Sequence, residues 1–209
     1  MSVRVAVVAF DGFDELDTFV ALGLLNRLAA SGWKAEIASP ASHVTSMNGV
    51  TVQAQRPLEF ANEADAVIFG SGLYARAIAE GAGKSGTLLD RLQLDPLRQT
   101  IGGQCSGVLL MARLGLLADM PASTDALSKP WVVQAGVRVI DAPFHARGPV
   151  ATAGGGLAAQ YLAAWMMARR AGFDAAAQAL HPAAPVGEKD EYVARLLGVV
   201  RPFVDAPAG

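Results

Sequence analysis

Cys105 has the surroundings of a nucleophile, and it is the one cysteine of the chain. It lies between a stretch of strand character and a stretch of helical character, and its neighbours in Gly102-Gly103-Gln104-Cys105-Ser106-Gly107 are mostly small. A nucleophile elbow has this layout, because the strand-to-helix turn is too sharp for bulky neighbours and points its side chain outward. The start of the following helix favours a thiolate over a thiol, so we expect a lowered pKa for Cys105.

The alternative is an inert, buried cysteine that acts as a small apolar side chain. A lone cysteine is more often of that kind, but the pattern around Cys105 favours the nucleophile. One cysteine forms no intramolecular disulfide, and the three scattered histidines, His43, His145 and His181, give little support for a metal site. We therefore expect a site without metal or cofactor, in a protein of the reducing cytoplasm.

Acidic residues follow the first predicted strand, at Asp14, Glu15 and Asp17. Each could be a surface charge at the start of a helix, where the positive end of the helix dipole favours carboxylates. In a parallel sheet, however, sites form where the carboxyl ends of the strands meet. The segments 11–17, 70–74 and 104–107 follow three predicted strands, so we expect them to converge.

Hydrophobic patterns predict the elements that position these segments. Short apolar runs predict strands over residues 3–10, 34–39, 66–69 and 98–104, and an edge strand or hairpin arm over 50–54. Helical spacing predicts helices or helical turns over residues 16–31, 75–80, 87–94, 108–117, 157–170 and 188–200. Further strand candidates are residues 131–133, 137–140 and 150–153. The alternation predicts an α/β fold with a parallel sheet and helices on both faces.

The composition fits one compact domain. The chain has 209 residues, of which 52% are hydrophobic and 17% charged, which excludes a disordered protein. We expect a single domain over residues 1–201 and a short, loose tail over residues 202–209. The formal net charge of -2 leaves no basic surplus for nucleic acid or an anionic membrane surface. No apolar stretch reaches the roughly 20 residues that cross a bilayer, so we expect no membrane partner.

Four motifs of the sequence resemble those of one family. They are Phe10-Asp11-Gly12-Phe13-Asp14-Glu15-Leu16-Asp17, Ile68-Phe69-Gly70-Ser71-Gly72, Gln104-Cys105-Ser106-Gly107 and Thr152-Ala153-Gly154-Gly155-Gly156. Over residues 3–170 the chain is similar to the ThiJ/PfpI superfamily, also called the DJ/PfpI family, and most similar to its isocyanide hydratase branch. The resemblance implies a homodimer with a class I glutamine amidotransferase-like fold. This fold is a flavodoxin-like three-layer α/β sandwich with a mainly parallel central sheet and a cysteine nucleophile elbow.

The resemblance also implies roles for individual residues. Asp17 would lie near Cys105, and Ser106 would supply the hydroxyl group that follows the nucleophile, or cap the next helix. A carboxyl group desolvated beside a thiol has a raised pKa, so Asp17 could donate a hydrogen bond to the thiolate or a proton to a substrate carbon. Backbone amides of Gly70-Ser71-Gly72, with that of Ser106, would bind an oxyanion.

The sequence departs from the family pattern at three places. Asp125 stands where many members carry a histidine, so we expect no Cys–His dyad of the protease type, which favours a hydratase over a peptidase. Ser71 stands in a segment that the family usually builds as Pro-Gly-Gly, and its side chain could narrow the pocket or add a donor. Gly102 and Gly103 lie in a strand that relatives build from β-branched residues, a change that the sequence does not explain.

Two functions of different class follow. The first is an isocyanide hydratase, a lyase, in which Cys105 attacks the terminal carbon of an isocyanide and Asp17 accepts and donates the proton. Water then releases an N-substituted formamide from a thioimidate. Glyoxalase, deglycase and amidase activities are further possibilities for the same elbow. The second function is a non-catalytic module that binds a small ligand or senses oxidants through Cys105.

Overall fold

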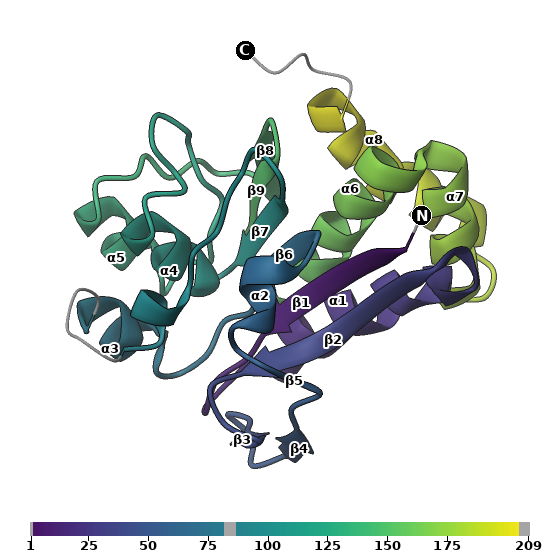
Figure 1. Cartoon of the computed structure of the whole chain (residues 1–209). Helices are drawn as coiled ribbons and strands as arrows, with labels where there is room; N and C mark the ends of the chain where they lie inside the picture. Colours follow the sequence, from purple (N-terminus) through teal and green to yellow (C-terminus); the bar gives the residue numbers. More distant parts are fainter. Residues whose placement is uncertain (1, 82–86, 205–209) are drawn as a thin grey trace.

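The computed structural model describes residues 2–81 and 87–204. A seven-stranded sheet with the order β5-β2-β1-β6-β7-β9-β8 forms its centre (Figure 1). The strands are β1 (Val3–Val8), β2 (Trp33–Ser39), β5 (Arg56–Pro57), β6 (Ala66–Phe69), β7 (Thr100–Gln104), β8 (Phe144–Arg147) and β9 (Val150–Ala153). All neighbouring pairs are parallel except β8 and β9. Apart from this sheet, β3 (His43–Thr45) and β4 (Thr51–Gln53) form the predicted hairpin.

Helices cover both faces of the sheet (Figure 1). One face carries α1 (Glu15–Leu25), α6 (Ala159–Ala171), α7 (Phe173–Leu180) and α8 (Lys189–Val204). The other carries α2 (Phe60–Glu63), α3 (Ala75–Glu80), α4 (Gly107–Arg113) and α5 (Lys129–Gln134). Short 3-10 turns lie at η1 (Asn26–Ser31), η2 (Leu89–Arg91), η3 (Gly156–Ala158) and η4 (His181–Ala183). The predicted flavodoxin-like α/β sandwich is confirmed.

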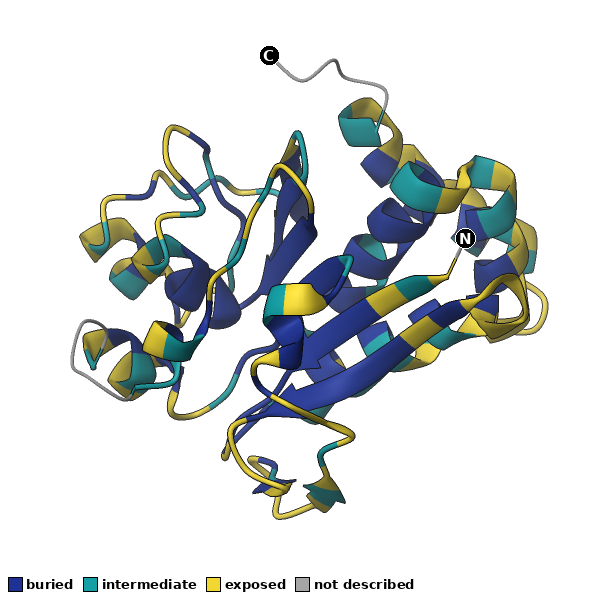
Figure 2. Ribbon diagram, in the orientation of Figure 1, coloured by how far each residue is buried: buried dark blue, intermediate teal, exposed yellow. Residues whose placement is uncertain are grey.

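The alternation of side chains along β1 divides the core in two. Val5 and Val7 belong to the cluster with α1 and α6, whereas Ala6 and Val8 belong to the cluster with α4. Successive residues of a strand point to opposite faces, so a strand covered on both faces needs an uninterrupted apolar run. Figure 2 shows the result, with the central strands buried and the exposed residues on outer helix faces and loops.

Two glycines of β7 have a packing reason. A Cβ atom on Gly103 would lie 2.2 Å from Sδ of Met111 in α4, and one on Gly102 would lie 3.1 Å from Cδ2 of Leu162 in α6. A buried helix therefore packs directly against each face of this strand. The close packing explains the departure from β-branched residues, and it fixes the positions of β7 and α4, the two elements that flank Cys105.

Several predicted elements differ in the structure. Residues 131–133 are part of α5, which has Pro130 in its first turn, a place where proline favours a helix. Residues 137–140 form only an isolated bridge, between Ala122 and Val139. Residues 87–94 contain only the turn η2, and the sequence pattern does not predict the edge strand β8.

The end of the chain also differs from the prediction. Residues 202–204 belong to α8 rather than to a loose tail, and Pro202 lies inside this helix. The ring of Phe203 packs against the rings of Phe144 and His145, with centroid distances of 5.4 and 5.2 Å. The last turn of α8 is thereby held against β8. Residues 205–209 of the predicted tail lie outside the described residues.

Candidate active site

Cys105 lies between β7 and α4 with a φ of 49°, a left-handed conformation that residues other than glycine rarely adopt. Its N–H donates to the carbonyl of Ala153 in β9 over 3.0 Å. The turn has no space for a side chain at Gly107, because a Cβ atom there would lie 2.5 Å from the carbonyl oxygen of Phe69. The predicted nucleophile elbow is therefore confirmed, and the small residues around Cys105 are a steric requirement.

Asp17 lies in the first turn of α1 and is fully buried beside Cys105. The N-cap of this helix is Asp14, whose Oδ1 accepts hydrogen bonds from two N–H groups of the first turn. Glu15 accepts hydrogen bonds from the β3–β4 hairpin. Asp14 and Glu15 thus serve the helix and its contacts, whereas Asp17 is the acidic residue of this turn that reaches the cysteine.

Burial raises the pKa of Asp17 to about 7. The charges of Asp14 and Asp125 contribute to this rise, whereas contacts with Ser71 and Cys105 oppose it. The carboxyl group is therefore close to half ionised at neutral pH, as the resemblance led us to expect for a carboxyl group desolvated beside a thiol.

Burial also raises the pKa of the Cys105 thiol, and the charge of Asp17 adds to this effect. The N–H of Gly155, which donates to Sγ over 3.3 Å, opposes it. The expected lowered pKa of Cys105 is wrong, because desolvation and a neighbouring carboxylate outweigh the N–H of Gly155. At neutral pH the site therefore holds a thiol beside a carboxyl group that can take its proton.

The segment Gly70-Ser71-Gly72 lies against the elbow. Ser106 Oγ accepts from the N–H of Gly72 at 3.1 Å and donates to the carbonyl of Gly72 at 3.3 Å, and it makes no bond that caps α4. The N–H of Gly70 donates to the carbonyl oxygen of Val8 over 3.3 Å. These bonds correct the prediction for Gly70 and Gly72, because both amides are already engaged within the protein. Of the predicted oxyanion residues, Ser71 and Ser106 remain.

The glycine turn after β9 forms another wall of the site. A Cβ atom on Gly154 would lie 2.4 Å from the carbonyl oxygen of Thr124, so this turn packs closely. Thr124 Oγ1 donates to the carbonyl of Cys105 over 2.8 Å, and Gly155 has a φ of 100°. The turn therefore packs against the loop before α5, and that loop holds the elbow through Thr124.

Gln104 is a site residue that the sequence analysis does not single out. It is fully buried at the end of β7, and its Nε2 donates to Asp17 Oδ1 over 2.6 Å. A buried amide needs hydrogen-bond partners. A glutamine at the end of an apolar strand, directly before the nucleophile, was therefore a signal of a polar contact within the site.

Asp125, at the position of the family histidine, is part of the loop before α5. Its Oδ1 accepts from the N–H groups of Leu127 at 2.9 Å and Ser128 at 3.0 Å, and its Oδ2 is buried without a hydrogen bond. Its charge raises the pKa values of both Asp17 and Cys105. Asp125 therefore orders the loop before α5 and adds negative charge to the site, two roles that a histidine base would not have.

Large apolar side chains are exposed beside the site, and we call them the apolar rim: Leu16, Leu73, Tyr74 and Leu157. Leu16 adjoins Asp17 in the sequence and contacts the glycine turn. Leu73 and Tyr74 follow the segment 70–72, and Leu157 follows the glycine turn. The exposed residues next to the site segments in the sequence are thus apolar, whereas the site itself holds the buried carboxyl group of Asp17.

Within residues 2–81 and 87–204, no three His, Cys, Asp or Glu side chains come together as a metal site. None of the helices in the same part of the chain has the length and hydrophobicity needed to span a bilayer.

Comparisons with protein-family models and with curated protein sequences find no match. Solved structures do match. A ThiJ/PfpI family protein from Pseudomonas syringae gives a TM-score of 0.74 at 16% identity, covering 98% of this chain and 90% of its own. Drosophila melanogaster DJ-1beta gives 0.69 at 21% identity, covering 95% and 99%. An AraC family transcriptional regulator from Pseudomonas putida gives 0.68 at 19% identity, covering 87% and 100%. The chain therefore has the fold of the DJ-1 and ThiJ/PfpI proteins.

Proposed function

We propose that the chain is a member of the DJ-1/ThiJ/PfpI family and a cysteine-dependent enzyme that acts on a small electrophile. The observation that carries this proposal is the pair formed by Cys105 at the elbow and the buried Asp17, whose pKa lies at about 7. An acid–base group works best when its pKa is near the working pH, because it can then both accept and donate a proton. Asp17 meets this condition at neutral pH.

The reaction that we assign is the hydration of an isocyanide. Sγ of Cys105 attacks the terminal carbon while the Asp17 carboxylate takes the thiol proton, and Asp17 then passes that proton to the same carbon, which gives a thioimidate. Water adds its oxygen to this carbon and one proton to nitrogen. The C–S bond then breaks as the hydroxyl proton returns to sulfur through Asp17. The sum is isocyanide plus water to an N-substituted formamide, with both side chains restored.

Two features favour this reaction over amide hydrolysis. Hydration of an isocyanide expels no leaving group, so it needs no histidine to protonate one, and Asp125 stands where such a histidine would be. The apolar rim of Leu16, Leu73, Tyr74 and Leu157 suits the hydrocarbon substituent of a neutral substrate. The substrate class that fits best is therefore a small, uncharged isocyanide.

The test is turnover of a simple aliphatic isocyanide, with the formamide measured by NMR. Wild-type protein should form the product, and Cys105→Ala and Asp17→Asn should lose at least about a hundredfold in rate. Leu97→Ala changes a fully exposed side chain before β7, so it is the control and should keep the wild-type rate. No product from several aliphatic isocyanides would reject the hydratase, and glyoxals and amides would then be the substrates to test.

A non-catalytic ligand-binding or redox-sensing module is the second candidate. The structural similarity to an AraC family regulator favours it. The raised pKa of Cys105 leaves little thiolate at neutral pH. Because peroxide reacts with the thiolate, oxidation of Cys105 should be slow. Treatment with mild peroxide followed by mass spectrometry distinguishes the redox-sensing module from the ligand-binding module. A stoichiometric sulfinate on Cys105 with a changed unfolding temperature would support a sensor, and an unmodified thiol would reject it.

We also propose a homodimer in the cytoplasm. The exposed apolar side chains of the rim favour self-association, because a second copy of the chain would remove them from water. A lone cysteine suits a reducing compartment. Light scattering should give about twice the chain mass of 21.6 kDa.

A further inference from the structure

The side chain of Gln104 is fully buried. Its NH2 group has two hydrogens but lies within hydrogen-bond distance of three acceptors. Its Nε2 donates to Asp17 Oδ1 at 2.6 Å and to the carbonyl oxygens of Gly155 at 3.1 Å and Gly156 at 3.0 Å. Its Oε1 has no hydrogen bond within the described chain. If the amide group were turned by about 180°, Oε1 would lie against the same three acceptors, which would be unfavourable. The NH2 group of Gln104 therefore faces Asp17.

The hydrogen bond to Oδ1 decides where Asp17 holds a proton. A protonated carboxyl group has a carbonyl oxygen, which is the better acceptor, and a hydroxyl oxygen. Because Oδ1 accepts from Gln104, Oδ1 is the carbonyl oxygen and Oδ2, which is buried without another partner, carries the proton. We infer that Gln104 is a positioning residue that keeps the exchangeable proton of Asp17 on Oδ2, the oxygen that Gln104 does not bind.

This inference rests on the proposed function, in which Asp17 takes and returns the proton of Cys105. Gln104 itself touches neither the sulfur nor a substrate. The carbonyls of Gly155 and Gly156 keep its amide from turning, and the N–H of Gly155 contacts Sγ over 3.3 Å. One side chain therefore orients the base and also secures the turn beside the nucleophile.

The test is the pH dependence of Cys105 alkylation by iodoacetamide, which needs no substrate and reports on a single thiol. In wild-type protein the rate should first rise near pH 7, where Asp17 ionises and can take the thiol proton. Gln104→Met keeps the side-chain length without a donor, so the carboxylate loses a hydrogen bond. This first rise should move up by about one pH unit, with a roughly tenfold lower rate at neutral pH. In the Asp17→Asn background, Gln104→Met should have no effect.

Gln99→Met is the matched control. Gln99 is a buried amide just before β7, and its Nε2 donates to the carbonyls of Ala61 and Ala64, 2.8 Å each. This variant should lose stability as Gln104→Met does but keep the wild-type alkylation profile. A structural role alone would therefore not produce the shift.

The outcomes separate the two proposals. If wild-type protein lacks the first rise, or Asp17→Asn leaves it unchanged, the acid–base pair fails and the proposed function with it. If Asp17→Asn removes the rise but Gln104→Met leaves it at the wild-type pH, the positioning role is overturned and the proposed function stands. A shift by Gln104→Met that persists in the Asp17→Asn background also overturns the positioning role.

If Gln104→Met does not fold, NMR of wild-type protein tests the same inference without that variant. The side-chain amide signals of Gln104 should move through a midpoint near pH 7 as Oδ1 gains charge, and they should not titrate in Asp17→Asn. Gln104 signals that stay constant between about pH 5 and about pH 9 would overturn the inference.

Discussion

At the scale of single residues, hydrogen bonding and burial shift the pKa values of two carboxyl groups in the first turn of α1 in opposite directions. Glu15 accepts hydrogen bonds from the β3–β4 hairpin, and the one from Ser46 lowers the pKa of Glu15. Asp17, two positions later, is fully buried, and its pKa is raised to about 7. Neighbouring carboxyl groups therefore have opposite shifts. Near neutral pH the protonated and charged forms of Asp17 coexist, which suits the proton transfer that we propose for it.

Asp17→Asn should stabilise the protein at high pH. The folded pKa of about 7 exceeds the ordinary value of 3.8, so the native state binds an additional proton between these pH values. Wild-type stability must fall as the pH rises through that range, by up to about 4 kcal/mol, and asparagine avoids the loss because it has no charge. Urea unfolding at about pH 4 and about pH 8 measures the difference. A gain of equal size at both pH values would contradict the raised pKa.

At the scale of elements, the elbow depends on how closely α4 approaches the ends of β6 and β7. The Cβ of an alanine at Gly107 would lie 2.5 Å from the carbonyl oxygen of Phe69, which is backbone of a central strand. The Cβ of an alanine at Gly103 would lie 2.2 Å from Sδ of Met111, which is part of a flexible side chain. The two glycines are therefore necessary for different reasons, and the neighbour of Gly107 cannot move without the sheet.

Gly107→Ala should accordingly destabilise the protein more than Gly103→Ala. Overpacking at Gly103 should cost about 1–3 kcal/mol, because Met111 can change its conformation, and Gly107→Ala should exceed this range. Urea unfolding of both variants gives the comparison. Met111→Ala should rescue part of the loss in Gly103→Ala and none of the loss in Gly107→Ala. Equal losses for the two glycine variants would contradict this account.

Local patterns in the sequence predict the α/β alternation and the elbow, but not the elements that depend on distant partners. Residues 131–133 have the β-branched character of a strand, yet Pro130 and the burial of Val132 make them a helix. The strand β8 exists because it pairs with β9. Gln104 and Asp17 are 87 residues apart, so no local motif contains their contact. The thiol pKa likewise depends on burial, which only the assembled fold sets.

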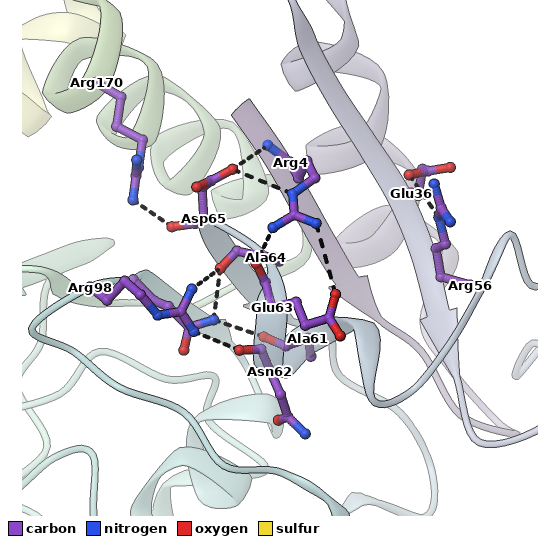
Figure 3. Close-up of polar contacts among 11 residues, drawn as sticks. Arg4, Glu36, Arg56, Ala61, Asn62, Glu63, Ala64, Asp65, Arg98 and Arg170 are labelled. Carbon is purple, nitrogen blue, oxygen red and sulfur yellow. Dashed lines mark hydrogen bonds and ion pairs between the residues drawn. The ribbon is translucent and has the colours of Figure 1, made fainter. Parts of the chain in front are cut away.

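At the scale of the whole molecule, the two ends of the sheet have different tasks. The carboxyl ends of the strands carry Cys105 and its partners, whereas a network of arginines holds the amino ends (Figure 3). Arg98 donates to the carbonyls of Asn62 and Ala64, and Arg170 donates to the carbonyl of Asp65 and the hydroxyl of Thr100. This network satisfies oxygens of the loops that precede β6 and β7. Stability and site chemistry should therefore respond to different substitutions.

Arg170→Met tests this separation. The arginine joins α6 to the starts of β6 and β7, and its loss leaves the carbonyl of Asp65 and the hydroxyl of Thr100 without this donor. We expect a loss of about 1–3 kcal/mol in unfolding free energy. The matched control is Arg169→Met, since Arg169 contacts the ring of Trp165 at 6.0 Å, a weaker interaction worth about 0.5–1 kcal/mol.

Both arginine variants should keep the wild-type pH profile of Cys105 alkylation, because the sheet lies between the network and the elbow. The profile and the urea midpoint, measured on the same samples, check the two halves of this prediction. A shifted alkylation profile in Arg170→Met would mean that the amino end of β7 transmits its position to the elbow. Unchanged stability in that variant would mean that the network does not hold the strands together. The expected pattern, a lower urea midpoint with an unchanged profile, assigns stability to one end of the sheet and proton chemistry to the other.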